Sequence, residues 1–113
     1  QEVNYQDIID AKKNSVELKQ QLKITQDAQK VVVFFPKSVN QNIEGTIHFY
    51  HPQHTNKDVV KPIALSNQKL QSINKNDLAK GNYTVKLLWK EGDKSYYIEK
   101  SCYVSLKISL IGI

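Results

Sequence analysis

From residue 22 onward, short runs rich in Val, Ile, Tyr and Phe alternate with polar turns, and this rhythm constrains the fold most. In the clearest run, residues 83–90, every odd position is apolar and lysines occupy two of the even positions. Successive side chains of a strand point to opposite faces, so the odd positions are predicted to face a core. They are Tyr83, Val85, Leu87 and Trp89. The run therefore predicts a strand that is buried on one face and solvated on the other.

Seven runs of this kind are predicted as strands. They lie near residues 22–26, 30–35, 43–50, 58–65, 69–73, 82–90 and 95–104. The connections are short, and those at residues 26–29 and 90–94 have the composition of hairpin turns. Short strands at such spacing favour two antiparallel sheets packed face to face. We therefore expect a mainly β fold, an immunoglobulin-like antiparallel β-sandwich of about seven strands, with one N-terminal amphipathic helix.

The same alternation assigns the two faces of the other strands. Residues expected to point inward are Ile43, Ile47, Phe49, Tyr96, Ile98, Cys102 and Val104. Residues expected to point outward are Thr46, His48, Tyr50 and Tyr97. Segment 31–35 is apolar on both faces, which is typical of a central strand covered twice. We expect the other sheet to cover one face and the helix to cover the other.

The segment from Tyr5 to about Leu22 is predicted as a single helix, and Asn4 followed by Asp7 fits its start. Apolar or small residues recur with the three-and-four spacing of one helix face, namely Ile8, Ala11, Ser15, Leu18 and Leu22, widened by Tyr5, Ile9 and Val16. Lysines interrupt this arc, so the helix is expected to lie along a surface. Residues 1–22 and the sandwich of residues 23–113 are expected to form one structural domain. Two arrangements are open for this helix. It either docks on the sandwich or forms a free stalk that reaches a membrane.

Charge and cysteine content limit the partners of the chain. Its formal net charge is +5, and all 16 residues counted as Lys or Arg are lysines. Base readout and bidentate phosphate contacts favour arginine, so we expect no nucleic-acid partner. Cys102 is the one cysteine, which excludes an intramolecular disulfide. The chain starts at Gln1 and contains no methionine, so we expect an upstream signal or anchor to have been removed.

Three equally spaced histidines, His48, His51 and His54, suggest copper or zinc binding. Residues three apart on a strand point to opposite faces, so His48 and His51 are not expected to share an ion. His51 and His54 could meet across a turn at Pro52 and are the candidate metal ligands. The alternative is an exposed strand end and loop that is rich in histidine. Both interpretations are open for the histidines.

No group of residues has the pattern of a catalytic site, and we predict that the chain is not an enzyme. Nucleophilic catalysis needs an activating base that a third group orients. Cys102 is predicted to face the core, where a thiol is inert. The four glycines are isolated, so no phosphate-binding loop is predicted. Trp89 and Tyr96 are interpreted as core aromatics rather than as a ligand platform.

An ordered set of residues resembles the FixH family over nearly the whole chain, from Tyr5 to about Val104. The set comprises Tyr5-Gln6, Ile9-Asp10-Ala11, Asn14, Phe35-Pro36, Gly45, Phe49-Tyr50, Pro52, Asp58, Leu78, Gly81, Tyr83, Val85, Trp89, Gly92, Tyr96 and Glu99-Lys100. Where this chain has His51-Pro52-Gln53, the family tends to have Arg-Pro-Ser. Residues 105–113 run past the expected end of the family and are expected to extend the last strand or to be disordered.

The resemblance implies a bacterial inner-membrane protein with one N-terminal membrane helix and this domain on the periplasmic side. FixH-like proteins act with a copper-transporting ATPase and an iron–sulfur protein to build the high-affinity, cbb-type cytochrome c oxidase. The resemblance thus implies a non-enzymatic assembly factor whose partners are oxidase subunits or other assembly factors. No cofactor is expected. A copper chaperone that uses His51 and His54, and a generic immunoglobulin-like exported binding module, are the alternatives.

Overall fold

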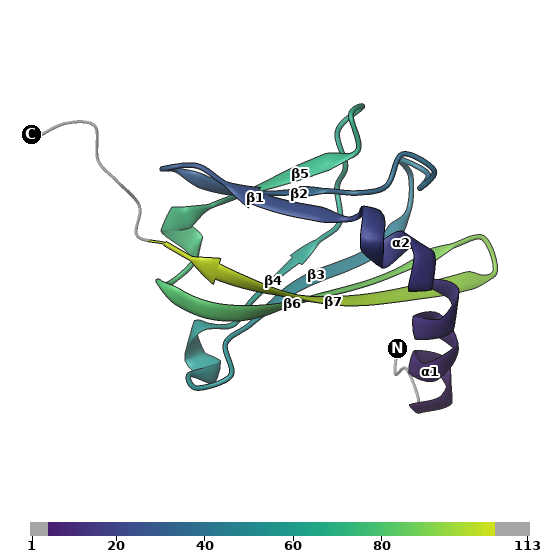
Figure 1. The fold of residues 1–113 in the computed structure, drawn as a ribbon, viewed down its shortest axis with the longest axis horizontal. Helices are drawn as coiled ribbons and strands as arrows, with labels where there is room; N and C mark the ends of the chain where they lie inside the picture. Colours follow the sequence, from purple (N-terminus) through teal and green to yellow (C-terminus); the bar gives the residue numbers. More distant parts are fainter. Residues whose placement is uncertain (1–4, 106–113) are drawn as a thin grey trace, which may run out of the picture.

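Two β-sheets stack face to face, and helices pack at the end of the stack where the longest hairpin turns (Figure 1). The computed structural model describes residues 5–105. The helices are α1 (Tyr5–Asn14) and α2 (Val16–Gln21), and two short 3-10 turns, η1 (Thr55–Lys57) and η2 (Lys75–Asp77), link strands. In the described part of the chain, neither helix has the length and apolar character needed to cross a bilayer.

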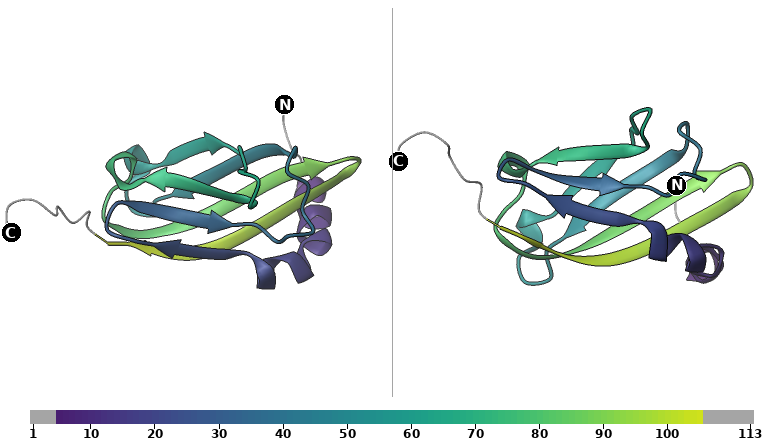
Figure 2. Two further views of the ribbon diagram at one scale, coloured as in Figure 1. Left: turned by 90° about the horizontal axis from the view of Figure 1, so that it is seen from above. Right: turned by 45° about the horizontal axis from the view of Figure 1, so that its top comes forward.

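All strand pairs are antiparallel. The three-stranded sheet has the order β1-β2-β5, with strands β1 (Lys23–Gln26), β2 (Lys30–Phe34) and β5 (Leu70–Asn74). The four-stranded sheet has the order β4-β3-β6-β7, with strands β4 (Val59–Pro62), β3 (Glu44–Tyr50), β6 (Gly81–Glu91) and β7 (Lys94–Val104). In immunoglobulin lettering these orders are A-B-E and C′-C-F-G. The predicted mainly β sandwich is confirmed, and Figure 2 shows its two layers.

The core lies between the two sheets and is formed by the residues that the alternation predicted. Along β6, Tyr83, Val85, Leu87 and Trp89 are buried. Phe35 meets the Trp89 ring edge-on at 5.4 Å between centroids, and Tyr96 stacks on it at 5.3 Å. These contacts confirm the interpretation of Trp89 and Tyr96 as core aromatics.

Gly45 allows β3 to approach β6 beneath the tryptophan. A Cβ atom at this position would lie 2.1 Å from the carbonyl oxygen of Leu88 and 2.7 Å from Cβ of Trp89. Gly92 is needed for its backbone conformation rather than for space. It is the first residue of the two-residue loop between Glu91 and Lys94, and its φ is +62°. A type II′ hairpin turn requires this conformation at its first central residue.

The predicted single helix is wrong in one respect, because the chain breaks at Ser15 between α1 and α2. The break rotates α2 relative to the predicted face, so Val16, expected on the apolar side, is 62% exposed. Ala11, Ser15 and Leu22 are buried as predicted. The predicted start at Asn4 and the predicted extension or disorder of residues 106–113 lie outside the described residues.

The other sheet covers one face of segment 31–35 as predicted, but the predicted cover of the other face by the helix is wrong. β2 is central in its sheet, but α1 packs on β7 of the other sheet, and Phe34 is 37% exposed. One residue, Leu22, joins α2 to β1. Because β1 is an edge strand, so short a connection cannot carry the helices over the outer face of β2. The helices therefore reach the free edge of β7 instead.

Candidate functional site

The free edge of β7 is where the helices meet the sandwich. The Ser15 hydroxyl donates to the carbonyl of Ala11 at 2.6 Å and accepts the backbone N–H of Tyr97 at 2.8 Å. One residue earlier, Nδ2 of Asn14 donates to the carbonyl of Ser95 at 2.9 Å. Two polar side chains of the helical segment therefore satisfy main-chain groups of an edge strand. Docking, rather than a free stalk, is the state of this helix.

Tyr97 lies on the outward side of β7, as predicted, and contacts α1. Nζ of Lys12 stands 5.6 Å from the centroid of the Tyr97 ring. The phenol donates to Oε2 of Glu99 at 2.5 Å. Burial, and then this bond to a carboxylate, raise the pKa of Tyr97. The phenol is therefore a fixed hydrogen-bond donor and not a proton-transfer group at neutral pH.

An open groove of about 430 Å³ runs between the helices and β7. Its lining residues are Lys12, Ser15, Val16, Lys19, Gln20, Tyr97, Ile98 and Glu99. The groove combines an exposed apolar side chain, Val16, with two lysines and the rim of a sheet. Such a mixture of apolar surface, charge and unfilled volume fits the surface of a protein segment. We call this feature the elbow groove.

The histidines are separated as predicted, with His48 on the outer face of β3 and His51 buried beyond its end. The rings of His51 and His54 lie 5.3 Å apart between centroids. The His54 backbone N–H donates to Nδ1 of His51 at 3.3 Å, so a neutral His51 ring carries its proton on Nε2. Neither His51 nitrogen then offers a free lone pair to a metal, and Lys57 and Lys80 line the same pocket. The described residues contain no group of three or more metal-ligating side chains.

Asp58 is the acceptor that organises this end of the sandwich. Its Oδ1 accepts the backbone N–H of His51 at 2.7 Å, and its Oδ2 lies 3.0 Å from Nε2 of His48. Both contacts hold the pKa of Asp58 below its ordinary value, and the bond from the His51 backbone has the larger effect. The carboxylate therefore fixes the start of the loop that carries His51 and His54, and its role is structural.

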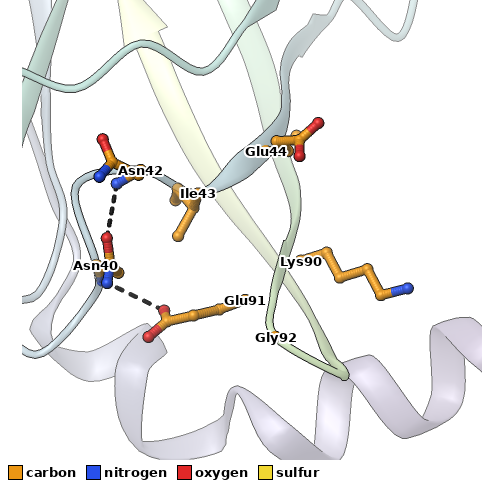
Figure 3. Close-up of a pocket in the computed structure, with 8 residues that line it drawn as sticks. Asn40, Asn42, Ile43, Glu44, Lys90, Glu91 and Gly92 are labelled. Atoms are coloured by element: carbon orange, nitrogen blue, oxygen red, sulfur yellow. Dashed lines mark hydrogen bonds between the residues drawn. The ribbon is translucent and has the colours of Figure 1, made fainter.

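Another pocket, of about 560 Å³, lies between residues 40–45 and the end of β6 (Figure 3). Its polar groups serve the loop, since the backbone N–H of Asn40 donates to Glu91 and that of Asn42 donates to Oδ1 of Asn40. Figure 3 shows the side chains of Glu44 and Lys90 pointing away from Asn40 and Glu91. The pocket therefore has no convergent set of reactive groups.

Cys102 is half-buried and packs against the core, close to its predicted position. Burial raises the pKa of its thiol, although the nearby charge of Lys75 opposes this. Lys75 itself is only 4% exposed, and its Nζ donates to Oγ of Ser105 at 2.8 Å. This buried lysine could not be predicted from the sequence, because no periodic pattern marks a residue in a 3-10 turn.

The model of the FixH family matches residues 1–103. The chain belongs to the FixH family. Membership suggests a role in cytochrome oxidase assembly; the family is typically membrane-associated and is not known for enzymatic activity. No curated protein and no solved structure matches the chain.

In this FixH-family chain, the residues that carried the resemblance are mostly structural. Phe35, Tyr83, Trp89 and Tyr96 build the core, while Gly45 and Gly92 permit close packing and a tight turn. Asn14 anchors α1, and Nζ of Lys100 donates to the carbonyl of Leu22 at 2.6 Å. The family pattern therefore marks how the helix and the two sheets of a FixH domain hold together. The elbow groove lies where these anchors meet.

Proposed function

We propose that this FixH-family chain is a non-enzymatic assembly factor for a high-affinity, cbb-type cytochrome c oxidase. It acts by protein contact from the periplasmic side of a bacterial inner membrane, to which a helix upstream of residue 1 anchors it. Its partners are oxidase subunits or other assembly factors of the same oxidase. No cofactor takes part.

The observation that carries this proposal is the docking of α1 on the edge of β7. Ser15 and Asn14 fix the helix to the sheet through two hydrogen bonds of 2.8 and 2.9 Å. A helix fixed in this way sets the orientation of the sandwich relative to a segment that precedes it. A domain held at a defined angle above a membrane is suited to presenting a surface to a membrane-embedded partner.

The test is purification of the full-length tagged protein from detergent-solubilised membranes of its host. We expect oxidase subunits to copurify and to be identified by mass spectrometry after brief crosslinking. The control is a tagged membrane protein of similar abundance and a single membrane helix. Recovery of the protein in the soluble fraction, or equal recovery of oxidase subunits with the control, would overturn the proposal.

A second candidate is a copper chaperone, favoured by the 5.3 Å separation of the His51 and His54 rings. The hydrogen bond on Nδ1 of His51 and the flanking lysines weigh against it. Contact with proteins is therefore the function that we propose, and metal binding is the alternative to be measured.

A further inference from the structure

The two-residue loop of the β6–β7 hairpin fixes which main-chain groups of β7 face outward. Residues that flank such a loop, here Glu91 and Lys94, form a hydrogen-bonded pair, and pairs of the two types then alternate along the ladder. The N–H and C=O groups that point away from β6 therefore belong to every second residue of β7, namely Ser95, Tyr97, Glu99, Ser101 and Tyr103. Together these residues form the free edge of the four-stranded sheet.

Both ends of this edge are closed by side chains. Asn14 and Ser15 bond Ser95 and Tyr97, as described above. At the other end, Nε2 of Gln26 donates to the carbonyl of Tyr103 at 2.6 Å. The opposite edge of the same sheet, at β4, is also bonded by a side chain, that of Gln71.

The middle of the β7 edge is different. Among the described residues, none supplies a hydrogen-bond partner to the outward N–H and C=O groups of Glu99 and Ser101. Lys100 lies between them, and its side chain donates from Nζ to the carbonyl of Leu22. Main-chain groups left open on a sheet edge are a template for an added strand.

The chemistry beside this open stretch indicates what kind of strand it takes. The elbow groove begins at Glu99 and presents Val16 with the cations of Lys12 and Lys19. The carboxylate of Glu99 accepts the Tyr97 hydroxyl and keeps its charge, so two lysines face one carboxylate here. The groove thus offers an apolar contact and an excess of positive charge. A second copy of the chain would bring its own +5 charge and the same two lysines, so charge complementarity disfavours a β7–β7 dimer.

We propose that the edge of β7 at Glu99 and Ser101 pairs with an extended, acidic segment of a partner protein. The main chain of that segment bonds the four open groups, an apolar side chain contacts Val16, and a carboxylate faces Lys12 and Lys19. This inference rests on the proposed function, because it names the surface through which assembly contacts are made.

The test uses NMR titration of the 113-residue chain with a capped peptide of alternating Glu and Val, seven residues long. We expect shift changes centred on the amides of Glu99 and Ser101, and weaker or no changes with the matching Lys and Val peptide. Ser101→Pro removes one outward N–H without touching the β6 ladder and is expected to weaken binding at least tenfold. Ser101→Ala, which keeps the N–H, should bind like the wild type.

Lys19→Glu is a second variant that does not alter β7, and it should also weaken binding of the acidic peptide. Lys13→Glu makes the same change of net charge outside the elbow groove and should bind as the wild type does. Equal binding of both peptides, unchanged binding by Ser101→Pro and Lys19→Glu, or changes confined to other strands would overturn the inference. So would dimerisation of the free chain that Ser101→Pro abolishes.

Complementation in the host separates this inference from the proposed function. We expect full-length Ser101→Pro and Lys19→Glu to support less oxidase assembly than Ser101→Ala and Lys13→Glu. If all four variants restore assembly in a strain lacking the gene, the β7 edge is not the contact surface, although the assembly role stands. If the strain lacking the gene assembles oxidase normally, the proposed function itself fails.

Discussion

Gln71 of β5 bonds Pro62 of β4 across the open side of the sandwich, with its Nε2 donating to the Pro62 carbonyl at 3.0 Å. The same side chain accepts the backbone N–H of Ala64 on Oε1 at 2.8 Å. Gln26 makes the equivalent pair on the other side, with Tyr103 and Ser105. In both places a glutamine amide accepts and donates hydrogen bonds at residues i and i+2 of the chain where an edge strand of the opposite sheet ends, as a neighbouring strand would. These two residues are the Gln clamps.

Gln71→Ala removes one clamp and is expected to lower the free energy of unfolding by about 1 kcal/mol, because two partly exposed hydrogen bonds are lost. Urea denaturation measures the change. Gln53→Ala, in an exposed loop, is the control and should unfold like the wild type. Equal stability of the two variants would show that the clamp contributes nothing.

Ser15→Ala should destabilise the chain by about 1–3 kcal/mol, because the Tyr97 N–H loses its acceptor at a buried site. Hydrogen exchange gives the more specific readout, since the Tyr97 amide should exchange faster while the Val85 amide in the core ladder changes only with global stability. Ser38→Ala, at an exposed loop position, is the matched control. An unchanged Tyr97 amide would contradict the docking of the helix on β7.

The two glycines singled out above should differ sharply when each is replaced by alanine. At Gly45 the new Cβ would overlap Leu88 and Trp89, and we expect a loss of about 3 kcal/mol or no folding. At Gly92 nothing lies within 4 Å, so only the positive φ opposes alanine, at about 1–2 kcal/mol. Thermal melts of both variants test the order, and a Gly92→Ala variant less stable than Gly45→Ala would reverse it.

The lowered pKa of Asp58 predicts that the fold loses part of its stability at acidic pH. Its pKa is lowered in the folded state, so its contribution to stability is full above the unfolded value near 3.8 and is lost as pH falls through the lower folded value. Asp58→Asn should therefore be less stable than the wild type at pH 7, with the gap narrowing below pH of about 4. Asp77→Asn, at a partly exposed ion pair, is the control. A gap that stays constant from pH 7 to pH 3 would contradict this role of Asp58.

Much of the fold could be predicted because strand alternation is a local property of the sequence. The strand boundaries and the inward residues of β3, β6 and β7 follow from period two alone. The break at Ser15 could not be predicted in this way, because it depends on a hydrogen bond to Tyr97, 82 residues away. The Gln clamps and the open edge at Glu99 are likewise relations between sheets. Polar side chains at strand ends give no periodic signal of such partners.

The histidine pair has a direct test in titration with Cu(I) and Cu(II). Because Nδ1 of His51 accepts a hydrogen bond and two lysines line the pocket, we expect weak binding of similar strength in the wild type and in His51→Ala/His54→Ala. Tight binding of one copper per chain that the double variant loses would instead establish the copper chaperone.

The amount of assembled oxidase in host membranes tests the central claim most directly. A strain that lacks the gene should lose the haem absorbance and activity of the cbb-type oxidase, and the full-length gene should restore both. The gene carrying His51→Ala/His54→Ala should restore them equally well, because we assign function to protein contact. Normal oxidase levels without the gene, or failure of the histidine variant alone, would contradict the account.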